Sequence, residues 1–241
     1  MKYIFDVDGT LTPSRQVIDD EFEFFFLNFC DHNDVYLATG SDYAKTLEQL
    51  DYLVCHAVKR SYNCSGNSQW YQGVEVYTND WQLPDIARQF LEQCLAEEQF
   101  DIRTGTHIEE RPGMVNYSVI GRGTVTPEQR AAWIAYDKRT NSRHRTADAF
   151  NTMFPDLQAN VGGETGLDIA PKGCDKAQIA KDFDADTMFF GDATHKGGND
   201  YPLAQALLAK GAVVHTVEDW QHTWRILNEL GVQHREMERN L

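Results

Sequence analysis

The chain has 241 residues, 41% of them hydrophobic and 24% charged, and a formal net charge of −15 at pH 7. This length suits one large domain or two modest ones, and the negative charge argues against duplex DNA or an anionic membrane as a partner. The five cysteines are scattered and form no CxxC pair, which excludes a zinc framework or a disulfide scaffold. We expect a cytoplasmic protein, because the sequence shows no signal peptide and no apolar run long enough to span a membrane.

The first part of the chain alternates between strand and helix patterns, which favours a parallel sheet with crossover helices. Between two of these elements, a polar stretch with glycine predicts a loop over residues 61–68. The predicted elements are, in order, a strand over 3–5, a helix over 15–28, a strand over 35–38, a helix over 43–53 and a strand over 74–77.

The middle of the chain has a different pattern. Residues 108–111 and 114–120 alternate between apolar and polar side chains, as half-buried antiparallel strands do. Thr126 and Pro127 are typical of the start of a helix. A second helix is predicted over 145–154 and one strand over 161–169.

Strands and helices then alternate again: helix 175–183, strand 187–190, helix 203–210, strand 212–214 and helix 217–230. The sequence therefore predicts the α/β class, with a Rossmann-like parallel-sheet core interrupted by an inserted α+β cap domain. We place the core at residues 1–79 and 172–241 and the cap at residues 80–171.

Polar side chains follow the predicted core strands or precede core helices at four points. They are Asp6 and Asp8, then Thr39 and Ser41, then Lys176, and finally Asp192, Asn199 and Asp200. Each alone is weak, since an Asp-x-Asp-Gly sequence is more often a turn and a lysine at a helix start is usually only solvated. Because the carboxyl ends of parallel strands bind ligands at one edge of a sheet, the four together indicate a site for a metal and a phosphate.

These residues resemble the motifs of the haloacid dehalogenase superfamily, which transfers phosphoryl groups through an aspartate. The motifs are Asp6-Val7-Asp8-Gly9-Thr10, Thr39-Gly40-Ser41, Lys176, and Gly191-Asp192 with Gly198-Asn199-Asp200. Over nearly the whole chain the sequence is similar, more narrowly, to the eukaryotic-type phosphomannomutases. The segments with this similarity are Phe5 to Thr12, Arg111 to Asn116, Ile120-Gly121-Arg122, and Gly162-Gly163 with Asp168.

The chemistry follows from the residue types. A carboxylate can accept a phosphoryl group as an acyl phosphate, and Asp6 is the candidate nucleophile, with Asp8 giving and taking the proton. Thr39 or Ser41, with Lys176, would hold the phosphoryl oxygens, and the sequence does not decide between the two hydroxyls. Mg²⁺ would relieve the repulsion between carboxylate and phosphate. Its predicted ligands are Asp6, Asp192 and the backbone carbonyl of Asp8, with Asn199 and Asp200 behind or beside them.

The resemblance also implies a substrate site. Its residues are Arg15, Arg111, Arg122, Arg130 and Asp168, with the aspartate on sugar hydroxyls. Guanidinium groups suit a second phosphate, and the alternative is that the arginines only pair with surface acids. Gly166 stands where the family has a ligand-contacting serine, Pro112 replaces an asparagine, and residues 203–210 lack the acid used for a second cation.

We therefore expect a phosphohexomutase that interconverts mannose 6-phosphate and mannose 1-phosphate, with glucose phosphates as further candidates. It would need Mg²⁺ and a hexose 1,6-bisphosphate activator. The alternatives are a Mg²⁺-dependent sugar-phosphate phosphatase on the same scaffold and a non-catalytic sugar-phosphate-binding protein. A homodimer through the cap is a further expectation from the family.

Overall fold

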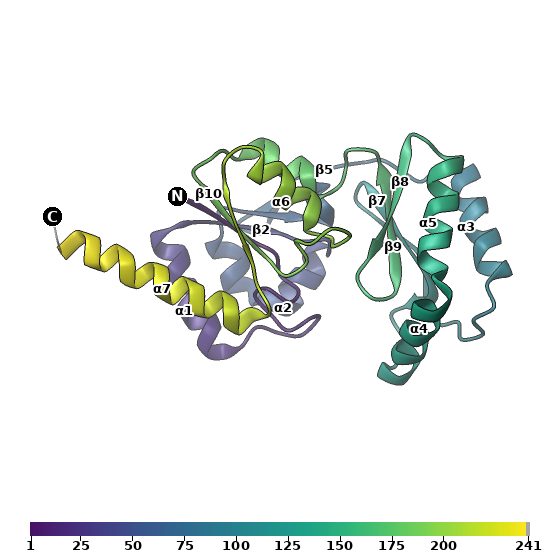
Figure 1. Cartoon of the computed structure of the whole chain (residues 1–241), viewed down its shortest axis with the longest axis horizontal. Coiled ribbons are helices and arrows are strands. Elements are labelled where there is room, and N and C mark those ends of the chain that lie inside the picture. The colour runs from purple at the N-terminus through teal and green to yellow at the C-terminus, as the bar shows by residue number, and fades with distance from the viewer. Residues whose placement is uncertain (240–241) are drawn as a thin grey trace. The chain divides into compact units, whose positions relative to one another are not determined.

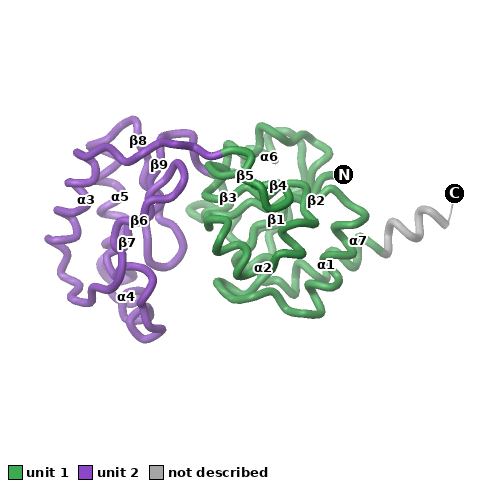
Figure 2. Tube along the Cα trace, turned by 180° about the vertical axis from the view of Figure 1, so that it is seen from behind, with its two compact units in different colours: residues 1–77, 176–241 green, residues 78–175 purple. Residues whose placement is uncertain are grey.

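The computed structural model describes residues 1–239. The chain divides into two compact units (Figure 2): residues 1–77 together with the segment from 176 onward form unit 1, and residues 78–175 form unit 2. The boundaries predicted from the sequence lie a few residues from these. Within the part of the chain that the structure describes, no helix is long and apolar enough to cross a membrane.

Unit 1 is built on one sheet with the strand order β11-β10-β1-β2-β3-β4-β5. β1 pairs in parallel with β10 and β2, and the neighbouring pairs β2–β3 and β10–β11 are also parallel, whereas β4 is antiparallel to β3. The predicted parallel core sheet is thus confirmed. The strands are β1 (Lys2–Phe5), β2 (Asp34–Ala38), β3 (Arg60–Asn63), β4 (Ser68–Tyr71), β5 (Val74–Thr78), β10 (Thr187–Gly191) and β11 (Val213–Thr216).

Helices cover both faces of this sheet (Figure 1). Alternate residues of β1 point to opposite sides: Tyr3 and Phe5 pack in a cluster with α1, α2 and α7, whereas Ile4 packs in a second cluster with α6 and a 3-10 helix. Burial on both faces explains the continuous apolar run Tyr3 to Phe5 of the central strand β1. The helices are α1 (Asp20–His32), α2 (Tyr43–Ala57), α6 (Tyr201–Leu208), α7 (Trp220–Arg239) and the 3-10 helices Cys64–Gly66 and Lys176–Asp182.

Three predicted elements of unit 1 differ from the structure. The helix expected from residue 15 begins at Asp20, because the Asp19 side chain caps it by accepting hydrogen bonds from the backbone N of Glu21 and Phe22. The predicted loop over 61–68 contains β3 and the start of β4, whose buried polar side chains hydrogen-bond to one another, as Ser61 does to Asn63. The helix predicted over 175–183 is the 3-10 helix Lys176–Asp182.

Unit 2 is an antiparallel sheet with the strand order β6-β7-β9-β8 and helices on one face. Its core joins Trp133 and Phe150 from the helices to Val115 and Tyr117 from the sheet. The single strand predicted over 161–169 is a hairpin, because the chain turns at Gly163, which has φ 50°. The elements are α3 (Asp85–Glu97), β6 (Thr106–Arg111), β7 (Met114–Arg122), α4 (Pro127–Thr140), α5 (Ser142–Met153), β8 (Leu157–Gly162) and β9 (Gly166–Pro171).

The other face of this sheet has a row of polar residues. Glu109, Asn116, Asp168 and Asn160 lie directly opposite one another on the four neighbouring strands β6, β7, β9 and β8. Because side chains alternate along a strand, all four lie on the face away from Tyr117 and the helices. This register brings residues far apart in the sequence onto one polar surface of unit 2.

Gly121 lies directly before Arg122 in β7, where the backbone of a neighbouring segment is packed closely against it. Its φ is +87°, and a Cβ there would lie 1.4 Å from the carbonyl oxygen of Thr104. We expect Gly121→Ala to lower the free energy of unfolding by at least about 2 kcal/mol, measured by urea unfolding of the full chain.

Gly123→Ala is the matched control. It has a similar φ of +97°, but a Cβ there would meet no atom of the described residues within 4 Å beyond its chain neighbours. Gly123→Ala should lower the free energy of unfolding less than Gly121→Ala does, because only backbone strain contributes. Equal unfolding midpoints for the two variants would contradict the packing that the structure shows at Gly121.

Candidate active site

The side chain of Lys176 joins two aspartates at the carboxyl edge of the core sheet. Its Nζ donates hydrogen bonds to Asp6 Oδ1 and to Asp200 Oδ1, both at 2.6 Å. Asp6 directly follows β1, Lys176 begins a 3-10 helix, and Asp200 directly precedes α6. All are buried, with side-chain exposures of 2% for Lys176, 3% for Asp6 and 0% for Asp200. The fold thus brings together predicted residues from both ends of the chain.

Burial and charge oppose each other in this group. Burial lowers the pKa of Lys176, but the neighbouring carboxylates of Asp200 and Asp6 more than offset this, so its pKa is raised and the ammonium stays charged. The pKa of Asp6 is raised well above its usual value, chiefly by burial and then by the nearby charge of Asp200. A further cation beside Asp6 would favour the ionised form of its carboxyl group.

The arrangement fits such a cation. Among the described residues, Asp6, Asp192 and Asp200 form a group whose ligand atoms all lie within 4.8 Å of one another. Asp6 Oδ2 is buried and has no hydrogen-bond partner among the described residues. Gly9 leaves room for Asp192, since a Cβ at Gly9 would lie 2.5 Å from Asp192 Oδ2. Carboxylate oxygens of this kind are the ligands that Mg²⁺ prefers in proteins.

The side chains of Asp8 and Asn199 lie outside that group. Asp8 Oδ1 accepts hydrogen bonds from the backbone N of Arg15 at 2.5 Å and from Gln49 Nε2 at 3.0 Å. Asn199 is exposed. Of the residues predicted as metal ligands, Asp6, Asp192 and Asp200 have their carboxylates close together. The Asp8 carboxylate lies outside this group and is held by the Arg15 backbone and the Gln49 side chain. The Arg15 backbone takes part in the core site through this bond to Asp8.

Thr39 and Ser41 follow β2 at the same edge of the sheet. Thr39 is buried, and its Oγ1 accepts a hydrogen bond from the backbone N of Ser41 at 3.0 Å. Its backbone N donates to the carbonyl of Tyr62 on β3 at 2.9 Å. The loop is thus tied to the sheet, and the Thr39 hydroxyl keeps its own hydrogen for donation. Both hydroxyls remain candidates for the phosphoryl group.

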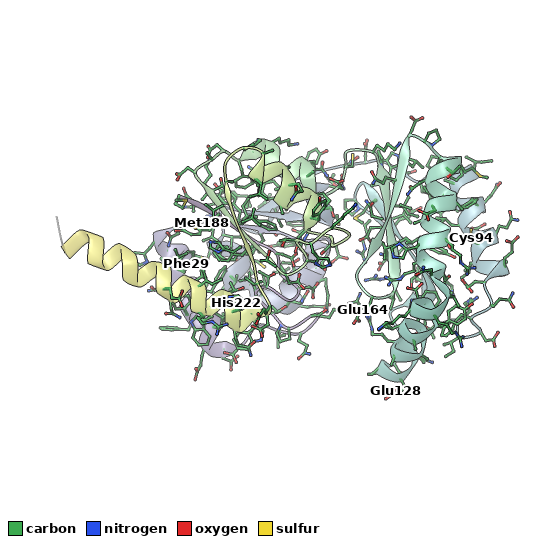
Figure 3. All side chains as sticks on the ribbon, viewed as in Figure 1. Phe29, Cys94, Glu128, Glu164, Met188 and His222 are labelled. Carbon is green, nitrogen blue, oxygen red and sulfur yellow. The ribbon has the colours of Figure 1, made fainter. Side chains whose placement is uncertain are left out.

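In unit 2, two predicted arginines converge on one acid. Glu109 Oε2 accepts hydrogen bonds from Arg111, at 2.5 Å from Nη2 and 3.1 Å from Nε, and lies 3.1 Å from Arg122 Nε. The third arginine, Arg130, pairs with Glu164 at 2.8 Å. Glu164 lies in the turn between β8 and β9 and is labelled in Figure 3. The arginines are therefore paired with acids, in geometries from which they could also bind an anion.

Asn116 links this group to Asp168. Its Oδ1 accepts from Arg122 Nη1 at 2.9 Å, and its Nδ2 donates to Asp168 Oδ1 at 2.6 Å. A Cβ at Gly166 would lie 2.8 Å from the Asn116 amide. Gly166 therefore leaves room for the Asn116 side chain.

Sequence reasoning missed Gln49, Glu109 and Asn116. Gln49 is buried in α2, among Thr46 and Leu50, and its Nε2 also contacts Thr12 Oγ1 at 3.2 Å. A polar residue on the buried face of a helix is a signal that could have identified it. Glu109 and Asn116 became visible only once the register of β6 and β7 was known.

Comparison with solved structures gives the class of the fold. A haloacid dehalogenase-like hydrolase from Bacteroides thetaiotaomicron aligns over 95% of this chain and 98% of its own, with a TM-score of 0.60 and 13% identity. A trehalose-6-phosphate phosphatase related protein aligns over 97% of this chain and 100% of its own, with a TM-score of 0.59 and 17% identity. The chain thus has the fold of the haloacid dehalogenase superfamily.

The family follows from sequence similarity. Residues 22–233 match the family described as "Eukaryotic phosphomannomutase". The phosphomannomutase of Saccharomyces cerevisiae is 33% identical over 239 residues, covering 94% of this chain and 92% of the relative. Phosphomannomutase 1 of Homo sapiens is 33% identical over 216 residues, covering 83% and 81%. The chain belongs to the eukaryotic phosphomannomutase family.

Gln49 should act by positioning Asp8. Replacing Gln49 with Met removes the Nε2–H donor while keeping a side chain of similar length, so the Asp8 carboxylate should lose its fixed orientation. We expect kcat for phosphate-ester turnover to fall about ten-fold with KM little changed, as for a loss in proton transfer. Steady-state kinetics across pH would measure both.

Glu48→Met, at the exposed neighbouring position on α2, is the control for a general effect on the helix. It should retain wild-type kinetics. Equal kcat values for Gln49→Met and the wild type, with both chains folded by circular dichroism, would contradict a role for Gln49 at Asp8.

Proposed function

We propose that the protein interconverts mannose 6-phosphate and mannose 1-phosphate through a phosphoaspartate at Asp6 and a hexose 1,6-bisphosphate intermediate. Its family membership supports the reaction, since the curated relatives over most of the chain are phosphomannomutases. The observation that most favours a mutase is the arginine group of the cap, Arg111, Arg122 and Arg130. Such a group suits a second phosphate, which a phosphatase of monophosphates does not need.

In the first half of the reaction, the Asp6 carboxylate attacks the phosphorus of the bisphosphate, and the phosphorus–ester oxygen bond breaks. Asp8 gives a proton to the leaving sugar oxygen. In the second half, a mannose monophosphate binds with its free hydroxyl at the phosphoaspartate. Asp8 takes the proton from this hydroxyl, whose oxygen attacks the phosphorus, so that the bisphosphate forms again and Asp6 is restored. The ammonium of Lys176, with a hydroxyl of Thr39 or Ser41, would bind the phosphoryl oxygens on which charge develops.

Mg²⁺ fits the core site, and Asp6, Asp192 and Asp200 would hold it, as their mutual distances and the unpartnered Asp6 Oδ2 support. The predicted carbonyl of Asp8 and the side chain of Asn199 remain proposed contributors. When bound, the ion would neutralise charge between the carboxylate and the phosphoryl group. It would also favour the ionised form of Asp6, whose pKa burial raises.

The cap would hold the non-reacting end of the substrate. Guanidinium groups bind phosphate oxygens by paired hydrogen bonds, which suits Arg111 and Arg122 for the distal phosphate, with Arg130 and Arg15 contributing charge. Asp168, fixed by Asn116 at 2.6 Å, would accept hydrogen bonds from sugar hydroxyls. We further propose the cytoplasm as the location and a homodimer through the cap as the assembly, with sugar phosphates rather than nucleic acids or membranes as partners.

The alternative is a Mg²⁺-dependent sugar-phosphate phosphatase on the same scaffold. Water rather than a sugar hydroxyl would then receive the phosphoryl group from Asp6. Both reactions would use Asp6, Asp8 and Lys176, so the core site does not separate them. The proposed mutase differs from the phosphatase in needing the cap arginines, which would bind a second phosphate.

Product analysis separates the two reactions. The purified chain is given mannose 1-phosphate or glucose 1-phosphate with Mg²⁺, with and without a hexose 1,6-bisphosphate. We expect 6-phosphate sugar to form, faster with the bisphosphate, and expect Asp6→Asn to abolish turnover because the nucleophile is lost. Release of inorganic phosphate without any 6-phosphate sugar would sink the mutase proposal in favour of the phosphatase.

Removing one cap arginine tests the second phosphate site. Arg122→Ala should raise KM for mannose 1-phosphate about ten-fold or more, since a hydrogen bond to a charged group contributes about 1.5–3 kcal/mol. Arg139→Ala, which removes the same charge from an exposed position on α4, is the control. Unchanged steady-state kinetics in Arg122→Ala would reject the role of this arginine.

A further inference from the structure

We propose that Glu109 weakens the hold of the cap arginines on the distal phosphate and thereby sets how fast the bisphosphate intermediate is released. This inference rests on the proposed function, because it concerns the phosphate site of that reaction. Its basis is that a single carboxylate oxygen, Glu109 Oε2, contacts both Arg111 and Arg122 at 2.5–3.1 Å.

The position of Glu109 is fixed by the sheet rather than by a flexible loop. Glu109 lies on β6 directly opposite Asn116 on β7. Asn116 in turn accepts a hydrogen bond from Arg122 Nη1 at 2.9 Å. The exposed fractions of the side chains are 34% for Glu109, 22% for Arg122 and 10% for Arg111. Each guanidinium is therefore oriented before an anion binds, which lowers the entropy that binding would lose.

The same carboxylate opposes the anion that these arginines would bind. A phosphate drawn to Arg111 and Arg122 must share them with Glu109 Oε2 or displace it. The carboxylate cancels the charge of one of the two guanidinium groups, and it repels the phosphate at short range. Because the group is only partly exposed, water and salt screen this repulsion less than they would at a fully exposed site.

A mutase would benefit from a distal phosphate site of moderate affinity. The bisphosphate must leave after one phosphoryl transfer and bind again with its two phosphates exchanged. In either orientation, one phosphate occupies the distal site, so tighter binding there stabilises the intermediate equally in both. Such uniform binding slows release without favouring the chemical step. Glu109 thus orients the arginines while limiting their affinity.

Glu109→Gln separates these two effects. The glutamine oxygen can still accept hydrogen bonds from both arginines, but the negative charge is gone. Binding of hexose 1,6-bisphosphate would be measured by titration calorimetry in the Asp6→Asn chain with Mg²⁺, in which phosphoryl transfer is blocked. We expect Glu109→Gln to lower Kd about five-fold, near the upper end of the range found for solvent-exposed ion pairs. Glu109→Ala, which also loses the acceptor, should bind less tightly than Glu109→Gln.

Glu110→Gln is the matched control. It removes the same charge from the next residue of β6, whose side chain is exposed and pairs with Arg88. This variant should bind the bisphosphate as its parent does. In chains with Asp6 intact, Glu109→Gln should lower kcat for the mutase reaction while single-turnover phosphorylation of Asp6 by the bisphosphate proceeds at the wild-type rate.

An unchanged or higher Kd in Glu109→Gln would overturn the inference, as would an equal decrease in Glu110→Gln. These results differ from failure of the proposed function, in which the unmodified chain would release phosphate without isomerising the sugar. The binding comparison does not depend on turnover, so it tests the effect of Glu109 on bisphosphate binding separately from the reaction.

Discussion

The buried contact between Lys176 and the carboxylates of Asp6 and Asp200 is the interaction on which the core site depends. It joins positions that are 170 and 24 residues apart in the sequence, each at 2.6 Å. Without the ammonium, two carboxylates would be left buried and unpaired, and breaking a buried ion pair in this way costs about 3–5 kcal/mol. The same contact directs Asp6 toward the edge of the sheet where Asp192 lies, so it fixes the fold of the segment and the geometry of the chemistry together.

The cap uses charge in a different way. Its arginines are paired with Glu109 and Glu164, and these pairs are partly exposed, so their strength is modest and open to competition from an anion. Deeply buried pairs suit a reacting group that must stay in place, whereas half-exposed pairs suit a ligand that must leave. In the proposed mutase reaction, the core would hold the nucleophile rigidly, and the cap would hold a phosphate reversibly.

Much of the core could be predicted because its strands and turns depend on residues that are close together in the sequence. The apolar run before Asp6 and the glycine after Asp8 predict a strand and a turn, and the order of such elements predicts the parallel sheet, which the structure confirms. Strand β3 was missed because its buried polar side chains find hydrogen-bond partners inside the protein, which no apolar pattern reveals. Ser61 donates to Asn63 Oδ1, and Asn63 Nδ2 donates to Thr46 Oγ1. Glu109 was missed because its role depends on side chains brought opposite it by the sheet register.

The proposed chemistry depends on transfer of the phosphoryl group to Asp6. It can be tested by mixing the full chain with Mg²⁺ and a hexose 1,6-bisphosphate, quenching in acid and reducing the acyl phosphate with borohydride. Peptide mass spectrometry would then locate the modified residue. We expect reduction at Asp6 alone, and no labelling in Asp6→Asn. Modification of Asp8 instead, or an unmodified chain that still turns over the sugar phosphate, would contradict it.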